Sequence, residues 1–369
     1  MKFGLFNLMS LRDNPGGVRG VLSDTRVMVR LAEEIGFDAA WFAEHHFTNN
    51  SISNSPMAVA SHMAAVTSRI RLGAAVLVLP LYHPLRLAQE IAFVDQASDG
   101  RVIIGIGPGY QPFEFQRYGV DLERRADHFL ECWAVMEQAL TRGHVDFQGE
   151  FIKIPPTTLM MRPYQTPLPD LYVASSNPAV LRRLVPSGAI PFVQVGWQGS
   201  KVLAEKVDSL RAAWQAAGLG HLHMPVAVQQ YIHVTDDPAQ ALEAAERARY
   251  VARLVNTLRR PVLEFDGFFV RPVPLENEPP LEVFRDNLII GDTEYVAERI
   301  VSEFRLLRPD YYNCFFQFGD MPIARAKRSL EKFGAEVLPL VEKALGPLGQ
   351  FGSRPIPPLA GSLAQRVAG

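Results

Sequence analysis

The sequence contains very little cysteine. Only two of its 369 residues are cysteines, Cys132 and Cys314, and they stand far apart in the chain. Two cysteines cannot build the disulfide framework of a small secreted domain, and their separation does not match the spacing of a structural metal site. We therefore expect two reduced thiols, an intracellular protein and no metal centre.

The sequence also lacks an excess of one charge and a long apolar run. The net charge is −2 at pH 7, which argues against nucleic-acid binding, because phosphate recognition relies on clustered Lys and Arg. No stretch approaches the roughly 20 apolar residues of a membrane span, and residues 1–7 do not resemble a cleaved leader. We expect a soluble, cytoplasmic protein that binds neither nucleic acid nor membranes.

Strand and helix signals alternate along the chain. Short apolar runs, typical of parallel strands covered on both faces, are separated by amphipathic helical stretches. This alternation with short connections predicts a parallel sheet with right-handed crossovers, and eight repeats predict a (β/α)8 barrel. The expected strands are 2–8, 39–42, 70–79, 101–107, 171–174, 192–195, 226–234 and 311–318, and the expected helices are 23–36, 56–67, one beginning at Pro84, 178–186, 200–217, 237–250, 293–306 and 323–343.

Two helices allow more detailed predictions. The first should turn an apolar face of Val27, Met28, Leu31 and Ile35 to the core. In the last, Pro339 should kink or end the helix, because proline lacks the backbone N–H group of the helical ladder.

The chain is longer than the roughly 250 residues of a typical barrel of this type. We predict a single barrel domain over residues 1–345, an insertion at about 251–290 before the eighth strand, and a loose tail at 346–369. Prolines and aromatic residues punctuate the insertion, so it is either an active-site lid or a surface hairpin without substrate contact.

The segment Glu44-His45-His46-Phe47 follows the strand that contains Trp41. In (β/α)8 barrels, catalytic groups collect at the carboxyl ends of the strands. Adjacent residues of an extended chain point to opposite faces, so the two histidines do not form a zinc site with Glu44. A histidine at a strand end can serve as a general base, and His45 is our candidate.

Two further segments follow strands. Gly105-Ile106-Gly107-Pro108-Gly109-Tyr110 does not match the dinucleotide-binding G-x-G-x-x-G pattern. We interpret it as a loop, with Gly107 and Tyr110, that forms the floor under a planar ligand. Ser175 and Ser176 precede a helix, where they either bind a phosphate or belong to an ordinary helix cap.

With these residues in place, the sequence resembles the bacterial-luciferase-like family of flavin-dependent monooxygenases. The resemblance is dense from Lys2 to about Gly119 and resumes at Val173-Ala174 and at 287–299. Its motifs are specific for the family but not for a subgroup. They are Met-Lys-Phe-Gly-x-Phe at the start, Gly36-Phe37-Asp38, Glu44-His45-His46-Phe47-Thr48, Leu72-Gly73-Ala74-Ala75, Val78-Leu79-Pro80, His83-Pro84, Asp95-Gln96-x-Ser98-x-Gly100-Arg101 and Gly105-Ile106.

The resemblance implies roles for individual residues. His45 matches the family's catalytic histidine, and Glu114 falls where the luciferase α-chain carries an acidic residue near that histidine. Glu44 and His46 are expected beside the cofactor. Ala75-Val76 falls where the family often places a non-proline cis peptide bond under the isoalloxazine ring, and Ser175 and Ser176 fall in the phosphate-binding segment.

The sequence departs from the luciferase α-chain at three of these positions. Gly107 replaces its reactive cysteine, Pro108 replaces the arginine that grips the flavin phosphate, and Ser175 replaces a glutamate. Light emission is therefore not expected, and the phosphate must be held in a different way.

The resemblance implies an enzyme that takes reduced FMN from a separate NAD(P)H-dependent flavin reductase. Reduced FMN and dioxygen would oxidise a small apolar organic substrate through a flavin hydroperoxide. Two alternatives keep the fold: hydride transfer from a reduced deazaflavin, and a flavin-binding barrel without turnover. The apolar substrate is suggested by Phe265, Phe268 and Phe269, and family members are commonly dimers.

Overall fold

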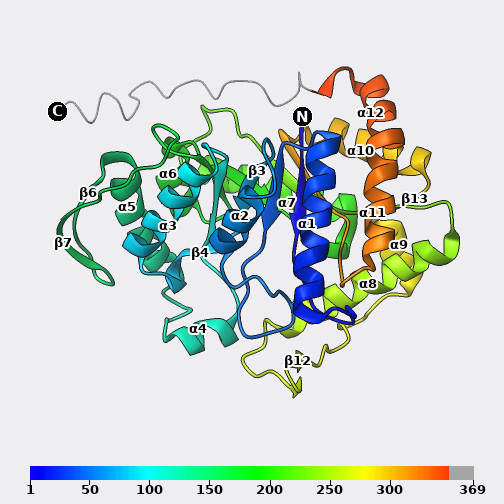
Figure 1. Cartoon of the computed structure of the whole chain (residues 1–369), viewed down its shortest axis with the longest axis horizontal. Helices are drawn as coiled ribbons and strands as arrows, with labels where there is room; N and C mark the ends of the chain where they lie inside the picture. Colours follow the sequence, from blue (N-terminus) through cyan, green and yellow to red (C-terminus); the bar gives the residue numbers. More distant parts are fainter. Residues whose placement is uncertain (349–369) are drawn as a thin grey trace.

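The computed structural model describes residues 1–348 and contains a closed barrel of parallel strands surrounded by helices (Figure 1). The strands pair in the order β1, β2, β3, β5, β8, β9, β10, β14, and β14 pairs with β1 to close the barrel. The predicted (β/α)8 fold is confirmed. The strands are β1 (Lys2–Asn7), β2 (Ala39–Phe42), β3 (Arg71–Ala74), β4 (Leu77–Val78), β5 (Val102–Gly107), β6 (His144–Gln148), β7 (Lys153–Thr158), β8 (Asp170–Val173), β9 (Ile190–Val193), β10 (Ala227–Val234), β11 (Phe265–Asp266), β12 (Phe269–Val270), β13 (Ile289–Gly291) and β14 (Tyr311–Phe315).

Helices cover the outside of the barrel, as the parallel crossovers require. The α-helices are α1 (Gly17–Ile35), α2 (Pro56–Ala64), α3 (Pro84–Ala97), α4 (Pro112–Tyr118), α5 (Arg125–Arg142), α6 (Pro178–Leu184), α7 (Gly199–Ala216), α8 (Pro238–Thr257), α9 (Leu281–Asn287), α10 (Thr293–Leu307), α11 (Ile323–Lys332) and α12 (Leu338–Leu345). Short helical turns lie at η1 (Leu79–Leu81), η2 (Val185–Ser187), η3 (Gly196–Gln198) and η4 (Phe333–Val337).

Several predicted elements differ from the structure. The apolar run 70–79 is broken into β3, β4 and a helical turn, and the cis peptide bond between Ala75 and Val76 lies at the break. An antiparallel hairpin, β6–β7, follows α5, and β13 pairs with the end of β10 outside the barrel. Both were missed because the elements are short and their signals are weak: β6 alternates polar and apolar residues over only five positions, β7 contains two prolines, and β13 has three residues.

Two helix predictions need correction. Helix α1 begins at Gly17, ahead of Ser23, and Val27 is 37% exposed, so it does not belong to the buried face that contains Met28. The final helix does not end at Pro339. The helix instead continues from α11 through the π-helical turn η4 into α12, and this local distortion directly before Pro339 agrees with the alternative prediction of a kink.

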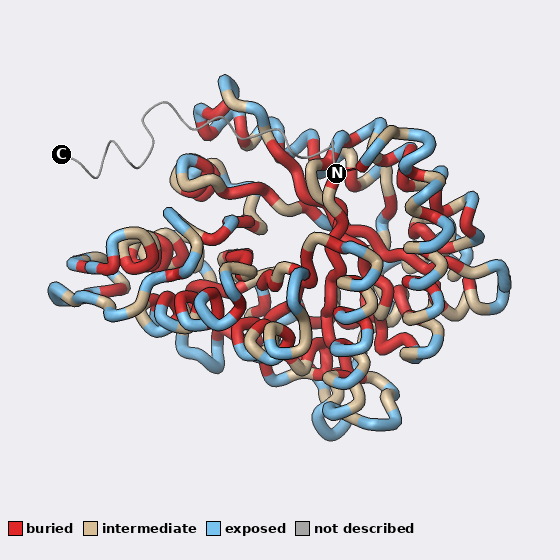
Figure 2. Tube along the Cα trace, turned by 45° about the horizontal axis from the view of Figure 1, so that its top comes forward, coloured by how far each residue is buried: buried red, intermediate tan, exposed pale blue. Residues whose placement is uncertain are grey.

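The barrel interior is filled by side chains, and Trp41 is the largest contribution from β2. A Cβ atom on Gly73 would lie 2.4 Å from Trp41 Cε3, and one on Gly4 would lie 2.7 Å from its Nε1. The indole ring meets Tyr172 edge-on at 4.8 Å between ring centroids. Small residues on neighbouring strands therefore make room for one large ring, and Figure 2 shows this buried centre.

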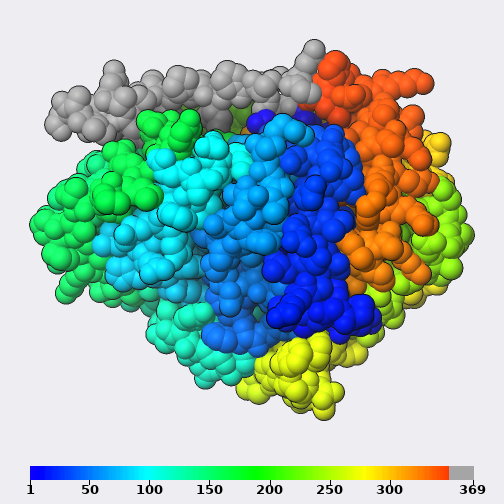
Figure 3. Space-filling model, in the orientation of Figure 1, coloured from blue at the N-terminus to red at the C-terminus, as the bar shows by residue number. Residues whose placement is uncertain are grey.

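The carboxyl ends of the strands lie at the lower edge of Figure 1, together with α4 and the segment that contains β12. In Figure 3 the same segment projects from this edge in yellow. We call residues 258–280 the cap segment. It is attached through a small apolar core of its own, formed by Phe113 of α4, Leu254, Leu258, Leu263 and Val270.

The opposite end of the barrel holds both ends of the described chain. Leu348 is buried, and its carbonyl oxygen accepts a hydrogen bond from the amino group of Met1 at 2.6 Å. The predicted tail thus packs on the barrel at its beginning, and residues 349–369 lie outside the described part. No helix within residues 1–348 combines the length and apolar character needed to span a membrane.

Candidate active site at the carboxyl ends of the strands

The loop after β2 buries a carboxylate, Glu44, whose side chain is fully enclosed. Its Oε1 accepts a hydrogen bond from His46 Nε2 at 2.9 Å. Its Oε2 accepts bonds from the Tyr82 hydroxyl at 2.7 Å and from the backbone N–H group of Val78 at 3.2 Å. Glu44 therefore joins the loops after β2 and β4, and its oxygens are already engaged within the protein.

His46 completes this buried chain. Because its Nε2 donates to Glu44, its Nδ1 is free to accept the hydrogen bond from the Tyr118 hydroxyl at 2.9 Å. Burial is the largest effect on Glu44 and raises the pKa of its carboxyl group, while the bond from His46 opposes the rise. Burial also raises the pKa of Tyr82, which remains a hydrogen-bond donor to Glu44.

His45 points to a different set of partners from His46, as expected for adjacent residues of an extended chain. Its Nδ1 lies 2.8 Å from Gln111 Nε2 and 3.3 Å from Glu114 Oε1. The same Glu114 oxygen accepts the backbone N–H group of His46 at 2.8 Å. The ring is 14% exposed, and no protein group among residues 1–348 bonds its Nε2.

The structure therefore brings His45 and Glu114 together, as the family resemblance implied. Glu114 lies in the first turn of α4, and its side chain is almost completely buried. The helix holds the carboxylate against the loop after β2, and the imidazole is bonded by two groups from the start of α4, Glu114 and the preceding residue Gln111. This arrangement leaves one ring nitrogen open at the mouth of the barrel.

The residues predicted to form a floor, Ala75-Val76 and the glycines of β5, lie next to one another, and a planar ligand above them stays a prediction. Ala75 and Val76 are joined by a cis peptide bond, which is the geometry that the family resemblance implied. A Cβ atom on Gly107 would lie 2.7 Å from Val76 Cγ2, and one on Gly105 would lie only 1.8 Å from the carbonyl oxygen of Ala74. Glycines on β5 thus allow the neighbouring strand to approach, and a larger residue at 107 would press on Val76.

Tyr110 lies between His45 and the cap segment. Its ring meets the imidazole edge-on at 6.3 Å, and its hydroxyl accepts a bond from Gln111 Nε2 at 3.3 Å. The guanidinium carbon of Arg259, in the cap segment, lies 5.2 Å from the centre of the Tyr110 ring. A cation over an aromatic face is attractive, so Arg259 helps to hold the cap segment next to Tyr110.

Ser175 and Ser176 follow β8, and the structure shows a helix cap at this point. Asn177 Oδ1 accepts hydrogen bonds from the N–H groups of Ala179 at 2.8 Å and Val180 at 3.4 Å. Ser175 Oγ accepts a bond from Asn177 N at 3.2 Å, and Ser176 is exposed. The capping interpretation holds for Asn177, and phosphate binding by the two serines stays a prediction.

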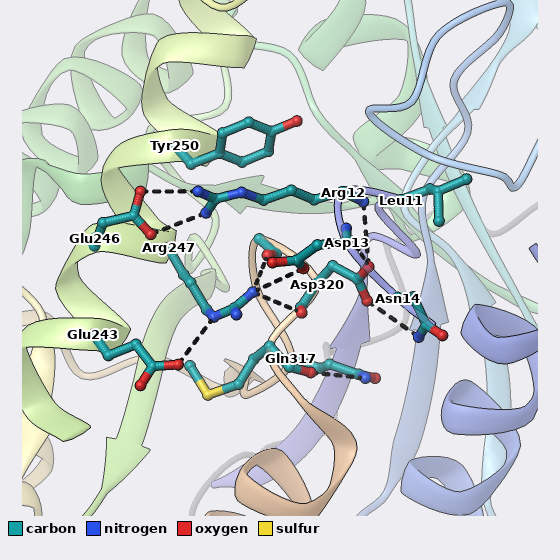
Figure 4. Close-up of polar contacts among 12 residues, drawn as sticks. Leu11, Arg12, Asp13, Asn14, Glu243, Glu246, Arg247, Tyr250, Gln317 and Asp320 are labelled. Carbon is teal, nitrogen blue, oxygen red and sulfur yellow. Dashed lines mark hydrogen bonds and ion pairs between the residues drawn. The ribbon is translucent and has the colours of Figure 1, made fainter. Parts of the chain in front are cut away.

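A polar network links helix α8 to the loops that follow β1 and β14 (Figure 4). Arg12, after β1, donates to both oxygens of Glu246 at 2.9 and 3.1 Å and lies 4.3 Å over the Tyr250 ring. Asp320, after β14, accepts the backbone N–H group of Arg12 at 3.2 Å. Arg247 donates to the carbonyl oxygen of Asp320 at 2.8 Å. These contacts fix α8 to the loops at both sides of the barrel closure.

Helix α8 is in turn linked to the loop that carries His45. Asn49 Nδ2 donates to the Tyr250 hydroxyl at 2.9 Å, and its Oδ1 accepts the backbone N–H group of Val270 at 2.9 Å. One amide therefore connects the His45 loop, α8 and the cap segment. The cap segment is therefore hydrogen-bonded to the mouth, and whether it is a lid or a surface hairpin without substrate contact stays a prediction.

The aromatic residues of the insertion do not share one environment. Phe265 packs on Phe113 at 5.4 Å, whereas Phe268 is 63% exposed and stacks on Phe269 at 4.4 Å. The apolar substrate that these three side chains suggested stays a prediction.

Three residues at the mouth were missed by the sequence patterns: Gln111, Tyr118 and Arg259. Such residues carry no periodic signal, and these three meet the Glu44-His45-His46 segment or Tyr110 only through the fold. Pro112 after Gln111 was an available hint, because proline at the first helical position marks Gln111 as the residue before α4.

Other predicted or candidate features lie away from this site. Cys132 and Cys314 are free and buried, and burial raises the pKa of the Cys132 thiol to about 12. Within residues 1–348 no three His, Cys, Asp or Glu side chains are grouped to hold a metal ion. A cavity of about 340 Å³ on the flank, between α7, α9 and α10, is lined by Gln198, Ser200, Lys201, Asp286, Asn287, Arg299, Ser302, Glu303 and Leu306.

Comparison with known proteins identifies the family. The model of the luciferase-like monooxygenase family matches residues 1–309. This chain belongs to that family. It is 27% identical over 349 residues to the oxygenase component of the flavin-dependent trigonelline monooxygenase of Acinetobacter baylyi, covering 92% of this chain and 95% of that protein.

Two solved structures share the fold of this family member. One is the oxygenating constituent of 3,6-diketocamphane monooxygenase of Pseudomonas putida, a type II Baeyer-Villiger monooxygenase in complex with FMN. It has a TM-score of 0.74 at 20% identity and covers 92% of this chain and 98% of its own. The other is an F420-dependent secondary alcohol dehydrogenase, with a TM-score of 0.68, 18% identity and the same coverage.

Proposed function

We propose that this luciferase-like protein is the oxygenase component of a two-component flavin-dependent monooxygenase. It would take reduced FMN from a separate NAD(P)H-dependent reductase and use dioxygen to oxidise a small, largely apolar organic substrate. The observation that supports this proposal most strongly is the environment of His45. Its Nδ1 contacts Gln111 and Glu114, while its Nε2 is open at the mouth.

The residues at the mouth suit a bound flavin. Ala75, Val76 and Ala174 have small or short side chains that are partly exposed. The glycines of β5 carry no side chain that would collide with these residues. Such a surface accommodates a planar ring system, and hydroxyl and backbone groups at Ser175 and Ser176 can donate hydrogen bonds to a phosphate. Glu44 and His46 support this surface from beneath through their bonds to Tyr82, Val78 and Tyr118.

Reduced FMN, when bound, supplies the electrons that activate dioxygen. The protein's own contribution is to orient the reactants, exclude water and manage a proton. His45 Nε2 holds or moves that proton at the mouth, and Glu114 stabilises the imidazolium form from the Nδ1 side. The cap segment, held by Asn49 and by Arg259 on Tyr110, limits the access of water.

The alternative chemistry on this fold is hydride transfer from a reduced deazaflavin. The structural similarity to an F420-dependent dehydrogenase keeps this candidate open, whereas the trigonelline and diketocamphane relatives are named as oxygenases. We place oxygenation first because one of the relatives that are similar over nearly the whole chain is named as a flavin-dependent monooxygenase. We further propose that the protein acts as a homodimer.

The proposal is tested with a flavin reductase, NADH, FMN and ¹⁸O₂ over a panel of ketones, aldehydes and N-heterocycles. Incorporation of one ¹⁸O atom into a product is the expected result. With the substrate found, His45→Ala should lower turnover roughly a hundredfold and leave the affinity for reduced FMN nearly unchanged. His62→Ala, an exposed histidine of α2, is the matched control.

Two results would contradict the proposal. Product that contains no ¹⁸O would exclude oxygen transfer from dioxygen. Unchanged turnover of His45→Ala would remove His45 from the chemistry even if the oxygenation itself is observed.

A further inference from the structure

Gln111 is a buried amide in direct contact with His45. It occupies the position before α4 and is completely enclosed, but its side chain does not cap the helix. Its Nε2 lies 2.8 Å from His45 Nδ1 and 3.3 Å from the Tyr110 hydroxyl. Its Oε1 is buried and has no hydrogen-bond partner within residues 1–348. A buried acceptor without a partner is uncommon and needs a physical explanation.

The two neighbours of His45 Nδ1 make opposite demands. An amide N–H group only donates, so it requires a lone pair on Nδ1, whereas a carboxylate oxygen only accepts, so it requires a hydrogen on Nδ1. Gln111 is the closer neighbour, at 2.8 Å against 3.3 Å for Glu114. Glu114 Oε1 is also satisfied by His46 N at 2.8 Å. The geometry therefore favours neutral His45 with its hydrogen on Nε2.

The protonated ring changes this balance. An imidazolium carries hydrogen on both nitrogens, and its Nδ1–H would face the N–H group of Gln111. Turning the amide by about 180° exchanges two atoms of nearly equal size. Gln111 Oε1 then accepts from Nδ1–H, the Tyr110 hydroxyl can donate to the same oxygen, and Glu114 is a second acceptor.

Both orientations of the amide leave one buried group unpaired. As placed, Oε1 has no partner. After rotation, the Nε2 group takes that same position and has no partner there. Neither orientation satisfies the whole amide, so their free energies are close, and the protonation of His45 can decide between them.

We propose that Gln111 is a positioning residue that sets which nitrogen of His45 carries the proton. In the resting protein its amide N–H group holds neutral His45 in the Nε2–H form, and the amide turns when His45 gains a second proton at Nδ1. In that state the Nε2–H group can pass its proton to an oxygen at the mouth, and the ring returns to neutral with hydrogen on Nδ1. This role in turnover rests on the proposed function, but the resting tautomer does not.

Other ionisable groups face this pair from each neighbouring element. Glu114 comes from α4, Tyr110 from the loop after β5, and Arg259 from the cap segment over Tyr110. Burial raises the pKa of Tyr110, so its hydroxyl stays protonated and can serve either amide orientation. Glu114 is the acceptor that remains when Gln111 is removed.

The tautomer is measured directly by ¹⁵N NMR of the flavin-free protein with ¹⁵N-labelled histidine, at about pH 9, where free histidine is neutral. The chain has nine histidines, so His45→Gln assigns the signal. We expect Nδ1 of His45 at a pyridine-type shift and Nε2 at a pyrrole-type shift. In Gln111→Met, which has similar volume but no donor, the two should exchange, because Nδ1–H then donates to Glu114.

Two further variants complete the experiment. Gln111→Glu offers only acceptors and should give the same exchange, so the proposal stays testable if Gln111→Met does not fold. Gln116→Met, on the exposed side of the same helix, should leave the tautomer unchanged. A wild-type His45 with hydrogen on Nδ1, or Gln111 variants that keep it on Nε2, would overturn the proposal.

Turnover separates this proposal from the proposed function. With an oxygenated product in hand, Gln111→Met should lower turnover on the order of tenfold with little change in the affinity for reduced FMN. The expected tautomer together with an absence of any oxygenation would contradict the function and leave the role of Gln111 in setting the tautomer intact. Full turnover in a Gln111→Met protein with exchanged tautomer would overturn its role in the reaction.

Discussion

Glu44 offers a strong test of how the site is built, because one carboxylate joins three parts of the mouth. Its oxygens accept hydrogen bonds from His46, Tyr82 and the backbone of Val78. Glu44→Ala removes the acceptor for all three donors and leaves them buried. Glu44→Gln keeps one oxygen for Tyr82 and Val78 and can donate its amide to the ring of His46.

The expected magnitudes follow from these contacts. A buried donor left without its partner costs about 1–3 kcal/mol, and Glu44→Ala leaves three such donors. Because the three losses share one cavity and do not add, we expect Glu44→Ala to lower the free energy of unfolding by about 3–5 kcal/mol. Glu44→Gln should lower it by about 1 kcal/mol.

The pH dependence of stability gives a second, independent test of the role of Glu44. Burial raises the pKa of Glu44 above the unfolded value of 4.5. The folded state therefore binds the proton more tightly, so the contribution of Glu44 to stability is full below about pH 4.5 and is lost as pH rises through the raised pKa. The difference in unfolding free energy between the wild type and Glu44→Gln should therefore become smaller as pH rises through this range.

Urea unfolding of the wild type, both variants and Glu90→Ala measures these differences. Glu90 pairs with Arg86 on the surface of α3, and its loss should cost less than about 0.5 kcal/mol. If Glu44→Ala were no more destabilised than Glu90→Ala, the buried carboxylate would not hold the mouth together, and our account of the site's construction would be wrong.

Three other predictions concern the barrel and the cap segment. Gly105→Ala places a Cβ atom 1.8 Å from the carbonyl oxygen of Ala74 and should prevent stable folding. Gly119→Ala has open space but a positive φ of 69° and should cost about 1 kcal/mol of stability. Thermal unfolding compares the two variants, and equal stability would refute the packing argument. Burial lowers the pKa of His233 from 6.5 to about 4, so the contribution of the neutral ring to folding stability is lost as pH falls through that range. Between pH 6.5 and 4 the wild type should lose roughly 3 kcal/mol more stability than His233→Asn. Parallel urea titrations that show the same loss in both proteins would contradict this prediction. Leu258→Ala, which empties part of the small core of the cap segment, should speed amide hydrogen exchange in residues 258–280 while β1 and β2 stay protected; unchanged exchange there would show that this core does not hold the cap segment.

The sequence predicted the barrel because strand and helix periodicity repeats eight times and leaves little choice of topology. The position of His45 after β2 was also readable, since strand ends that carry polar residues meet at one face of such a barrel. The cis peptide bond at Ala75–Val76 came from family resemblance, not from any local signal in the residues themselves.

The parts that could not be predicted depend on contacts between distant segments. Gln111 and Tyr118 meet the Glu44-His45-His46 segment only after α4 has packed against the barrel. The same is true of Asn49, which joins three segments through one amide. The break in the 70–79 strand was hidden because a continuous apolar run looks alike whether or not the backbone remains extended.

The central claim is that this luciferase-like protein uses reduced FMN to activate dioxygen, and rapid mixing tests it most directly. The protein is first combined with reduced FMN without oxygen and then mixed with oxygenated buffer, and the absorbance spectrum is followed in time. The account predicts a long-lived spectrum that differs from those of oxidised and reduced FMN. Immediate return of oxidised FMN at the rate seen without protein, together with tight binding of a reduced deazaflavin, would contradict the claim.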